Sequence, residues 1–188
     1  MKGIRSECEG GILHPLVYSA KDRQLSCIEN LSKIYLIAGV SGSGKSTVGQ
    51  ALAKRMEIPF FDADDFHPVA NVTKMEEGHP LADEDRWPWL QDLNLHLHQQ
   101  PAAGCVLACS ALKEVYRQVL SEGLENRILW VFLIGTFELI QTRMELRDHF
   151  MPPALLRSQF DTWEAPQYGL QLDITEDIDT LIDQIITQ

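Results

Sequence analysis

The chain has 188 residues, and its 27 acidic residues outnumber its 16 lysines and arginines, which gives a formal net charge of −11. At 45 % hydrophobic residues it can bury a substantial core, and its length fits one domain with room for a mobile insertion. The acidic balance argues against a general binder of nucleic acids or membrane surfaces, because a phosphate-rich partner would be repelled outside local basic spots. An anionic substrate therefore requires a locally basic pocket.

Cysteine usage and hydropathy indicate a reduced, cytoplasmic protein. The four cysteines form no CxxC pair and have no histidine partners at metal-binding spacing, and two of them lie in an apolar run. No apolar stretch approaches the roughly 20 residues that a transmembrane helix needs. Charges interrupt the N-terminal region, where a signal peptide requires a compact apolar core.

Residues 1–32 differ from the rest of the chain, because they show no clear hydrophobic period and their glycines and charges are scattered. We expect a disordered N-terminal extension here, followed by one domain over residues 33–188. A regulatory arm and an upstream error in the start site are alternatives that would look the same.

Beyond residue 33, short apolar runs alternate with helical patterns. Such alternation indicates βαβ units and a parallel sheet covered on both faces, an α/β fold. Strands are predicted at 34–38, 59–61, 105–109, 128–134 and 170–174. Helices are predicted at 48–56, 68–77, 86–99, 113–121, 137–147 and 153–163, with a last helix carrying the stripe Ile178, Leu181, Ile182, Ile185 and Ile186.

The segment 39–47 reads GVSGSGKST and fits the G-x-x-x-x-G-K-[ST] pattern of a phosphate-binding loop. Its glycines allow a tight turn that aims successive backbone N–H groups at one phosphate, and the following helix adds the positive end of its dipole. Lys45 can reach the β- and γ-phosphates, and Ser46 can offer its hydroxyl to Mg²⁺. A chance glycine-serine turn is the alternative, but the required strand and helix flank the motif. The predicted nucleotide-binding residues are Gly39, Val40, Ser41, Gly42, Ser43, Gly44, Lys45, Ser46 and Thr47.

An acidic turn, FDADDFHP at residues 61–68, follows the second predicted strand. Ligands of open α/β sheets bind at the carboxyl ends of the strands. We expect Asp62 to face the phosphate loop and to orient Mg²⁺, and Asp64 to face the neighbouring crevice and accept a hydrogen bond from a substrate hydroxyl. Asp65 is interpreted as a helix cap, and His67 is equally open to an incidental or a functional role. The third strand ends without an aspartate, so Asp62 replaces the second Mg²⁺-linked acid of many P-loop proteins.

Basic residues after the phosphate loop are candidates for an anion pocket, although each is open to the simpler interpretation of a solvated helix face. Lys113 follows the third predicted strand and faces the crevice. Arg143 and Arg147 lie four residues apart on one helical face, ahead of the helix-breaking segment 149–153. Such a broken helical pair can close over a nucleotide as a lid, and its arginine can stabilise charge on a transferred phosphoryl group. The other candidates are Lys74, Arg86 and Arg117.

Taken together, these motifs resemble those of the gluconate kinases. The similar segments occur in the family's order and cover nearly all of residues 33–166. They are 39–47, 62–68, Asn71 with Lys74 and Met75, 78–81, 83–86, 88–90, 108–113 with Tyr116 and Arg117, and 149–153 with 158–160.

The resemblance implies a shikimate-kinase-like P-loop fold, a three-layer α/β/α arrangement with a five-stranded parallel sheet and a helical lid at about residues 141–165. It also implies transfer of the ATP γ-phosphate to the 6-hydroxyl of D-gluconate by a cytoplasmic enzyme, commonly a homodimer, without nucleic-acid or membrane partners. The implied roles are catalysis for Lys45, Asp64 and Arg147, adenine contact for Arg143, Mg²⁺ contact for Ser46 and Asp62, and gluconate contact for Asp64, His67, Arg86, Lys113, Arg117 and His149.

Three rival functions stay open from the sequence. The nearest is another small-molecule kinase, for shikimate or a nucleoside monophosphate, although shikimate kinases carry a glycine run where this chain has Cys-Ser-Ala-Leu at 109–112. The second is a nucleotide-dependent binding module without turnover, against which the full set of candidate catalytic groups counts. A nucleic-acid enzyme is more distant, because the chain is acidic and lacks a basic-aromatic pattern.

Overall fold

The computed structural model of the chain describes residues 33–100, 103–146 and 153–188. The predicted N-terminal extension, and with it the predicted domain boundary, falls on residues 1–32 and lies outside this part of the chain, as do Arg147 and His149. No helix within the described residues is long and apolar enough to cross a bilayer.

A parallel sheet of five strands lies at the centre of the fold, in the order β2-β3-β1-β4-β5. All five residues of the middle strand β1 are buried, which explains its continuous apolar run in place of an alternating pattern. Residue Ile34 of β1 lies opposite Cys105 of β3 on one side and Ile128 of β4 on the other. The predicted five-stranded parallel sheet is thereby confirmed. The strands are β1 Ile34–Ala38, β2 Phe60–Asp62, β3 Cys105–Ala108, β4 Ile128–Ile134 and β5 Leu170–Asp173.

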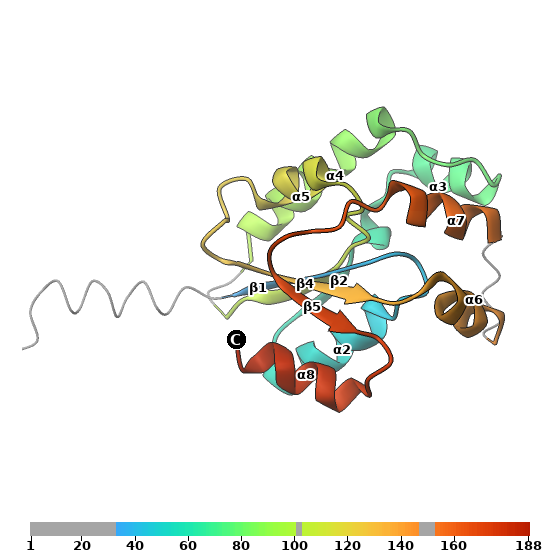
Figure 1. Cartoon of the computed structure of the whole chain (residues 1–188). Helices are drawn as coiled ribbons and strands as arrows, with labels where there is room; N and C mark the ends of the chain where they lie inside the picture. Colours follow the sequence, from blue (N-terminus) through green and yellow to red (C-terminus); the bar gives the residue numbers. More distant parts are fainter. Residues whose placement is uncertain (1–32, 101–102, 147–152) are drawn as a thin grey trace, which may run out of the picture. The chain divides into compact units, whose positions relative to one another are not determined.

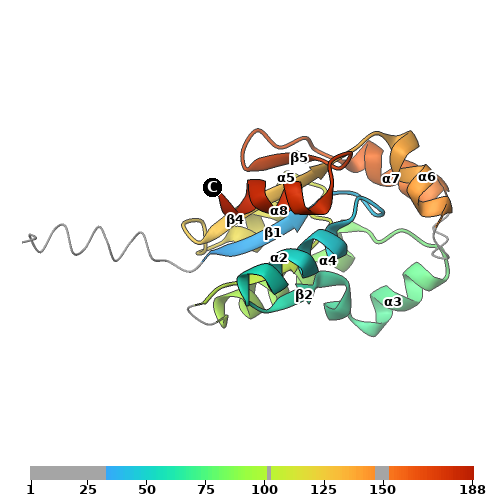
Figure 2. The ribbon, with the colours of Figure 1, turned by 90° about the horizontal axis from the view of Figure 1, so that it is seen from below.

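Helices cover both faces of the sheet and complete the three layers (Figures 1 and 2). On one face lie α2 (Lys45–Met56) and α8 (Ile178–Ile186), whose apolar residues pack with Tyr35 and Ile37 of β1. On the other lie α4 (Asp83–His98) and α5 (Glu114–Ser121), which pack with the alternate β1 residues. Each face therefore has its own hydrophobic core, and the two cores fix the sheet between them.

The remaining helices of the described residues gather beyond the carboxyl ends of the strands, to which the arrowheads in Figure 1 point. These elements are the 3-10 helix η1 (Ala63–Phe66), α3 (Val69–Glu76), α6 (Phe137–Glu145) and α7 (Pro153–Thr162). Ligands bind at this end of a parallel α/β sheet. Helix α7 lies inside the segment predicted to form a lid, although its closure stays a prediction.

Several local predictions differ from the structure: α2 begins at Lys45, three residues before its predicted start, and α6 ends at Glu145, two residues before its predicted end. Helix α4 begins at Asp83, three residues before the predicted start, because its first turn carries three acidic residues and the Asp85 carboxylate accepts a hydrogen bond from the Ala82 amide. The cap expected at Asp65 is wrong. Helix α3 follows Pro68 without a side-chain cap, whereas Asp62 accepts a hydrogen bond from the Asp64 amide and caps η1.

Candidate active site

The phosphate loop connects β1 to α2 and turns on glycines in the left-handed region. Gly42 has φ of 78° and Gly44 has φ of 100°, values that strain any residue with a Cβ atom. A Cβ on Gly42 would also come within 2.6 Å of the Met144 side chain. Both positions therefore require glycine. With glycine there, the loop can turn tightly enough to direct its backbone amides towards the start of α2.

Ser43 provides a test of whether this loop fits a phosphate. Its side chain is buried, with 2 % of the residue exposed, and among the described residues its Oγ is the buried side-chain polar atom that lacks a hydrogen-bond partner. A buried hydroxyl without a partner is costly unless a ligand or water satisfies it. A nucleotide phosphate bound in this glycine-rich turn would give the Ser43 hydroxyl the hydrogen-bond acceptor that it lacks.

Ser46 and Asp62 come together at the carboxyl ends of β1 and β2. The Ser46 Oγ donates to the Asp62 carboxylate at 2.6 Å, so Asp62 faces the phosphate loop as predicted. These are hard oxygen donors, and Mg²⁺ is commonly held by one or two such protein groups together with substrate phosphates. Within the described residues there is no cluster of three His, Cys, Asp or Glu side chains for an all-protein metal site. The pair thus fits a metal ion shared with a nucleotide.

Lys45 lies where the phosphate loop meets the acidic turn. Its Nζ donates to the Val40 carbonyl at 3.1 Å and so lies across the loop. Burial lowers the pKa of Lys45, and the nearby carboxylates of Asp64 and Asp62 act in the opposite direction. The neighbouring Cys109 thiol is buried at the end of β3, which raises its pKa to about 12 and keeps it protonated. Lys45 is therefore the cation that these carboxylates face.

Asp64 opens into the crevice next to Lys45. Partial desolvation and repulsion from Asp62 raise the pKa of its carboxyl, while Lys45 and His67 act in the opposite direction. A carboxylate with a raised pKa is a better proton acceptor. Asp64 thus presents its carboxylate to the pocket beside Lys45.

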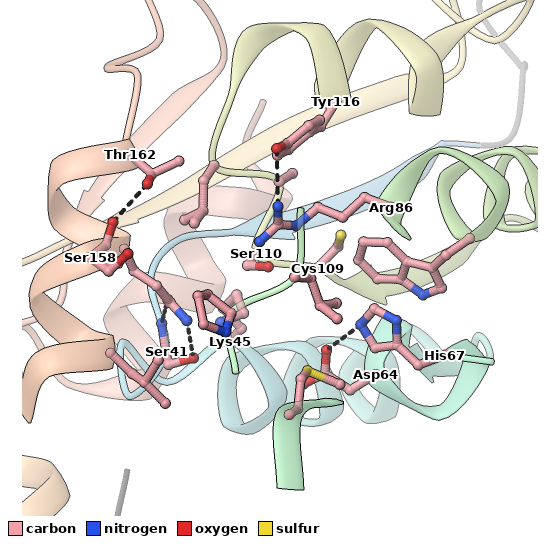
Figure 3. Close-up of a pocket in the computed structure, with 18 of the residues that line it drawn as sticks. Ser41, Lys45, Asp64, His67, Arg86, Cys109, Ser110, Tyr116, Ser158 and Thr162 are labelled. Carbon is pink, nitrogen blue, oxygen red and sulfur yellow. Dashed lines mark hydrogen bonds and ion pairs between the residues drawn. The ribbon is translucent and has the colours of Figure 1, made fainter. Parts of the chain in front are cut away.

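A pocket of about 240 Å³ joins these groups to the opposite wall of the crevice. Figure 3 shows Lys45, Asp64 and His67 along one side, with Arg86 and Tyr116 approaching from the other. The strand end at Cys109 and Ser110 forms the floor between them, and α7 supplies Ser158 and Thr162. The predicted residues that line this pocket are Ser41, Lys45, Asp62, Asp64, His67 and Arg86.

Arg86 contributes the positive charge on the far wall. Its Nη1 donates to the Tyr116 hydroxyl at 3.3 Å and lies 3.6 Å from the Asp83 carboxylate. Lys113 also binds Asp83, through Nζ at 2.7 Å and 2.9 Å, and does not line the pocket. Asp83 therefore links both cations, but only Arg86 reaches the crevice directly.

Arg117 has a different environment from the one predicted. The residue is 1 % exposed, and its guanidinium donates to the backbone carbonyls of Ala111, Leu112 and Glu164. Its Nε also binds the Glu114 carboxylate at 3.0 Å. These bonds use the donors that a sugar acid would need, and Arg117 does not line the pocket. In the structure Arg117 therefore holds the loop after β3, and its predicted contact with substrate stays a prediction.

Sequence reasoning missed Gln159 as a site residue. Its Oε1 accepts from the Ser41 amide at 2.7 Å, and its Nε2 donates to the Ser41 hydroxyl at 3.0 Å. The segment 158–160 carried part of the family resemblance, which was the one signal pointing to it. The predicted adenine contact, Arg143, lies outside the pocket and binds the Ile174 carbonyl at 2.7 Å.

Comparison with known proteins places this geometry in a family. Residues 41–183 match the family model described as "Shikimate kinase". A protein from Xenopus tropicalis named "Probable gluconokinase" is 42 % identical over 172 residues, covering 81 % of this chain and 90 % of its own. The thermosensitive gluconokinase of Escherichia coli K12 is 42 % identical over 158 residues, covering 80 % and 83 %. The crystal structure of a gluconokinase from Sinorhizobium meliloti 1021 superposes with a TM-score of 0.77 at 37 % identity, covering 84 % of this chain and 91 % of its own.

The parallel sheet, the phosphate loop and the crevice beside it define an ATP-dependent P-loop kinase. Two relatives named as gluconokinases are more than 40 % identical to this chain over most of both chains. The chain therefore belongs to the gluconokinase family. The fold and family implied by the resemblance are confirmed.

Proposed function

We propose that this protein is a gluconokinase, which transfers the γ-phosphoryl group of ATP to the 6-hydroxyl of D-gluconate and releases 6-phospho-D-gluconate and ADP. The single observation that supports this most strongly is the pocket itself. It joins Lys45 of the phosphate loop, the hydroxyl-accepting Asp64 and the cationic Arg86 in one space of about 240 Å³. A polyhydroxy acid has the matching groups, namely an alcohol at one end and a carboxylate at the other.

The nucleotide half of the site is formed by residues 39–47. Their backbone amides and the N-terminus of α2 bind the phosphates, and Lys45 neutralises charge that develops on the transferred group. Ser46 and Asp62 are the residues that would hold a Mg²⁺ ion bound with the nucleotide, and the ion would supply neutralisation of phosphate charge. The adenine contact predicted for Arg143 and the catalytic role predicted for Arg147 belong to this half of the proposal.

The acceptor half orients the alcohol. Asp64 accepts a hydrogen bond from the attacking hydroxyl, so its oxygen lone pair is directed at the γ-phosphorus. A bond forms between that oxygen and the phosphorus, the bond to the bridging oxygen of ADP breaks, and Asp64 accepts the hydroxyl proton. The raised pKa of the Asp64 carboxyl supports this assignment.

The carboxylate of the acceptor is assigned to the far wall. Arg86 is the arginine that lines this wall of the pocket, across from Lys45, and a guanidinium binds carboxylates in a bidentate geometry. Lys113 acts indirectly, because it binds Asp83, which in turn lies next to Arg86. The gluconate contact predicted for His149 stays a prediction. We further propose that the protein is cytoplasmic and forms a homodimer. Sedimentation equilibrium of the full chain would test the oligomeric state.

An acceptor panel tests the proposed function directly. ADP release is measured with gluconate, related sugar acids, shikimate and nucleoside monophosphates as acceptors, each with ATP and magnesium. We expect gluconate to give the highest kcat/KM, and ³¹P NMR of the product to show a phosphomonoester on the primary carbon. Properly folded protein that releases no ADP with gluconate would contradict the proposal, and preference for another acceptor would redirect it.

A further inference from the structure

Asn71 is a buried polar residue beside the pocket and takes no part in the proposed phosphoryl transfer. It lies in α3 and is 4 % exposed. Its Nδ2 donates to the Asp85 backbone carbonyl at 2.9 Å and lies 3.4 Å from the His67 Nδ1. A carbonyl oxygen can only accept hydrogen bonds, so the Asp85 carbonyl fixes which end of the Asn71 amide is the nitrogen. The second N–H of that nitrogen then faces the imidazole ring.

The orientation of Asn71 determines where the proton of a neutral His67 is located. Because Nδ1 faces an N–H donor, it must be the acceptor nitrogen of the ring, and the proton is on Nε2. Burial lowers the pKa of His67, which supports a neutral ring. The ring is also held in plane, since it stacks on Trp89 with centroids 4.1 Å apart and an angle of 17°. Trp89 is anchored in turn through its Nε1, which donates to the Ala63 carbonyl at 2.9 Å.

The Nε2 of this fixed ring points towards Asp64. The distance from Nε2 to the Asp64 Oδ1 is 3.9 Å, which is too long for a direct hydrogen bond, and Figure 3 shows the two side chains facing each other at the pocket. An N–H donor and a carboxylate acceptor separated in this way match the two hydrogen-bonding capacities of one alcohol. A hydroxyl can accept from Nε2 and donate to Asp64 at the same time.

We propose that Asn71 is a positioning residue that fixes His67 as its Nε2–H tautomer, so that His67 and Asp64 together bind one hydroxyl of the acceptor. This inference deepens the proposed function and relies on it for the identity of the acceptor as a polyol. It makes the site selective for a neutral alcohol, because an acceptor-only group at the same position would face the Asp64 carboxylate without a proton to share.

The tautomer is measured first, in the wild-type chain without substrate. Two-bond ¹H–¹⁵N correlation spectra of protein labelled at histidine distinguish the two neutral tautomers at neutral pH. We expect the Nε2–H form for His67. The Nδ1–H form would overturn the proposal. This measurement needs no turnover, so it is independent of whether gluconate is the acceptor.

The variant Asn71→Asp then tests the dependence on Asn71. It keeps the shape of the side chain but presents oxygens to the His67 Nδ1, so the neutral ring carries its proton on Nδ1 and Nε2 no longer donates. We expect the KM for gluconate to rise between about two-fold and ten-fold, the effect of one lost hydrogen bond, with the KM for ATP unchanged. Asn94→Asp is the matched control, because Asn94 also donates to backbone carbonyls, those of Leu120 and Glu122, and does not line the pocket.

A double-mutant cycle separates this mechanism from a general structural loss. In His67→Gln the side-chain amide supplies an N–H donor that does not depend on the position of a ring proton. We therefore expect Asn71→Asp to have no further effect on the gluconate KM in that background. Equal effects of Asn71→Asp with and without His67 would overturn the proposal. If Asn71→Asp does not fold, Asn71→Ala replaces it in the same cycle. A wild-type chain that phosphorylates no alcohol would instead contradict the proposed function, and the NMR readouts would still decide the role of Asn71.

Discussion

Gln159 of α7 and Ser41 of the phosphate loop are joined by two hydrogen bonds, one from the Ser41 amide at 2.7 Å and one to the Ser41 hydroxyl at 3.0 Å. The two residues are 118 positions apart in the chain. Because Ser41 precedes the amides at the start of α2, this bridge leaves those amides free for phosphates. Helix α7 is thus attached to the loop that it was predicted to cover.

Removing this bridge should weaken nucleotide binding. For Gln159→Ala we expect the KM for ATP to rise roughly five-fold or more, because two hydrogen bonds of about 0.5–1.5 kcal/mol each are lost between α7 and the loop. Steady-state kinetics at saturating gluconate measure the effect. Gln141→Ala is the control, since Gln141 of α6 makes a local hydrogen bond to Glu145 in the part of the chain that the structure describes. An unchanged KM for ATP would show that the bridge does not contribute to nucleotide binding.

Lys45 carries the largest expected effect on turnover. Lys45→Ala should lower kcat by about 10²–10³-fold, the loss typical of removing one group that stabilises transition-state charge, while the fold is retained. Circular dichroism checks that the fold is retained, and the acceptor assay measures kcat. Lys54→Ala, an exposed position of the same helix, should behave like wild type. Near-normal turnover of Lys45→Ala would contradict its role.

Arg86 and Lys113 should differ in their effects on the acceptor, because only Arg86 lines the pocket. Arg86→Gln is expected to raise the KM for gluconate by roughly 10- to 100-fold, the effect of losing hydrogen bonds to a charged group. Lys113→Ala acts through Asp83, and a rise below about five-fold is expected for the loss of a half-exposed ion pair. Neither variant should change the KM for ATP. A larger effect at Lys113 would place the acceptor carboxylate on the other side of Asp83.

The sequence predicted the features that depend on local pattern. Continuous apolar runs such as β1 indicated buried parallel strands, and the spacing of glycines around Lys45 indicated the phosphate loop and the helix after it. Asp62 could be oriented towards that loop because the carboxyl ends of neighbouring parallel strands meet at one edge of the sheet.

What the sequence could not show is which partner each polar side chain finds through tertiary packing. Lys113 and Arg117 both looked like anion ligands, but Asp83 binds the first and backbone carbonyls bind the second. Gln159 and Asn71 have ordinary polar side chains with no charge to draw attention. Their roles depend on contacts that form only when α7 meets the phosphate loop and when α3 meets α4.

Asp83 should make stability depend on pH in the acidic range. Hydrogen bonds from Lys113 and then Tyr116 hold the pKa of its carboxyl below the ordinary value of 3.8. The folded state thus favours the ionised carboxylate, and this stabilisation is complete above about pH 5 and is lost as the pH falls through the lowered pKa. Asp83→Asn should be less stable than wild type at pH 7, and the difference should narrow as the pH falls below about 4. Urea unfolding across this range measures it, with Asp92→Asn on the exposed side of α4 as the control. A difference that is constant with pH would contradict the assignment.

Arg117 should determine stability rather than substrate affinity. Arg117→Met leaves the carbonyls of Ala111, Leu112 and Glu164 without their buried donor, and we expect the free energy of unfolding to fall by about 3 kcal/mol or more. Lysine should not restore it, because one ammonium cannot reproduce the geometry of a planar guanidinium. The control is Arg55→Met, which breaks an exposed ion pair with Asp183 and should cost no more than about 1 kcal/mol.

Chemical denaturation and gluconate kinetics decide whether Arg117 stabilises the fold or binds the acceptor. If Arg117→Met were as stable as Arg55→Met but had a strongly raised gluconate KM, the guanidinium would have to leave its carbonyls to bind the acceptor, and the substrate role predicted from the sequence would be restored.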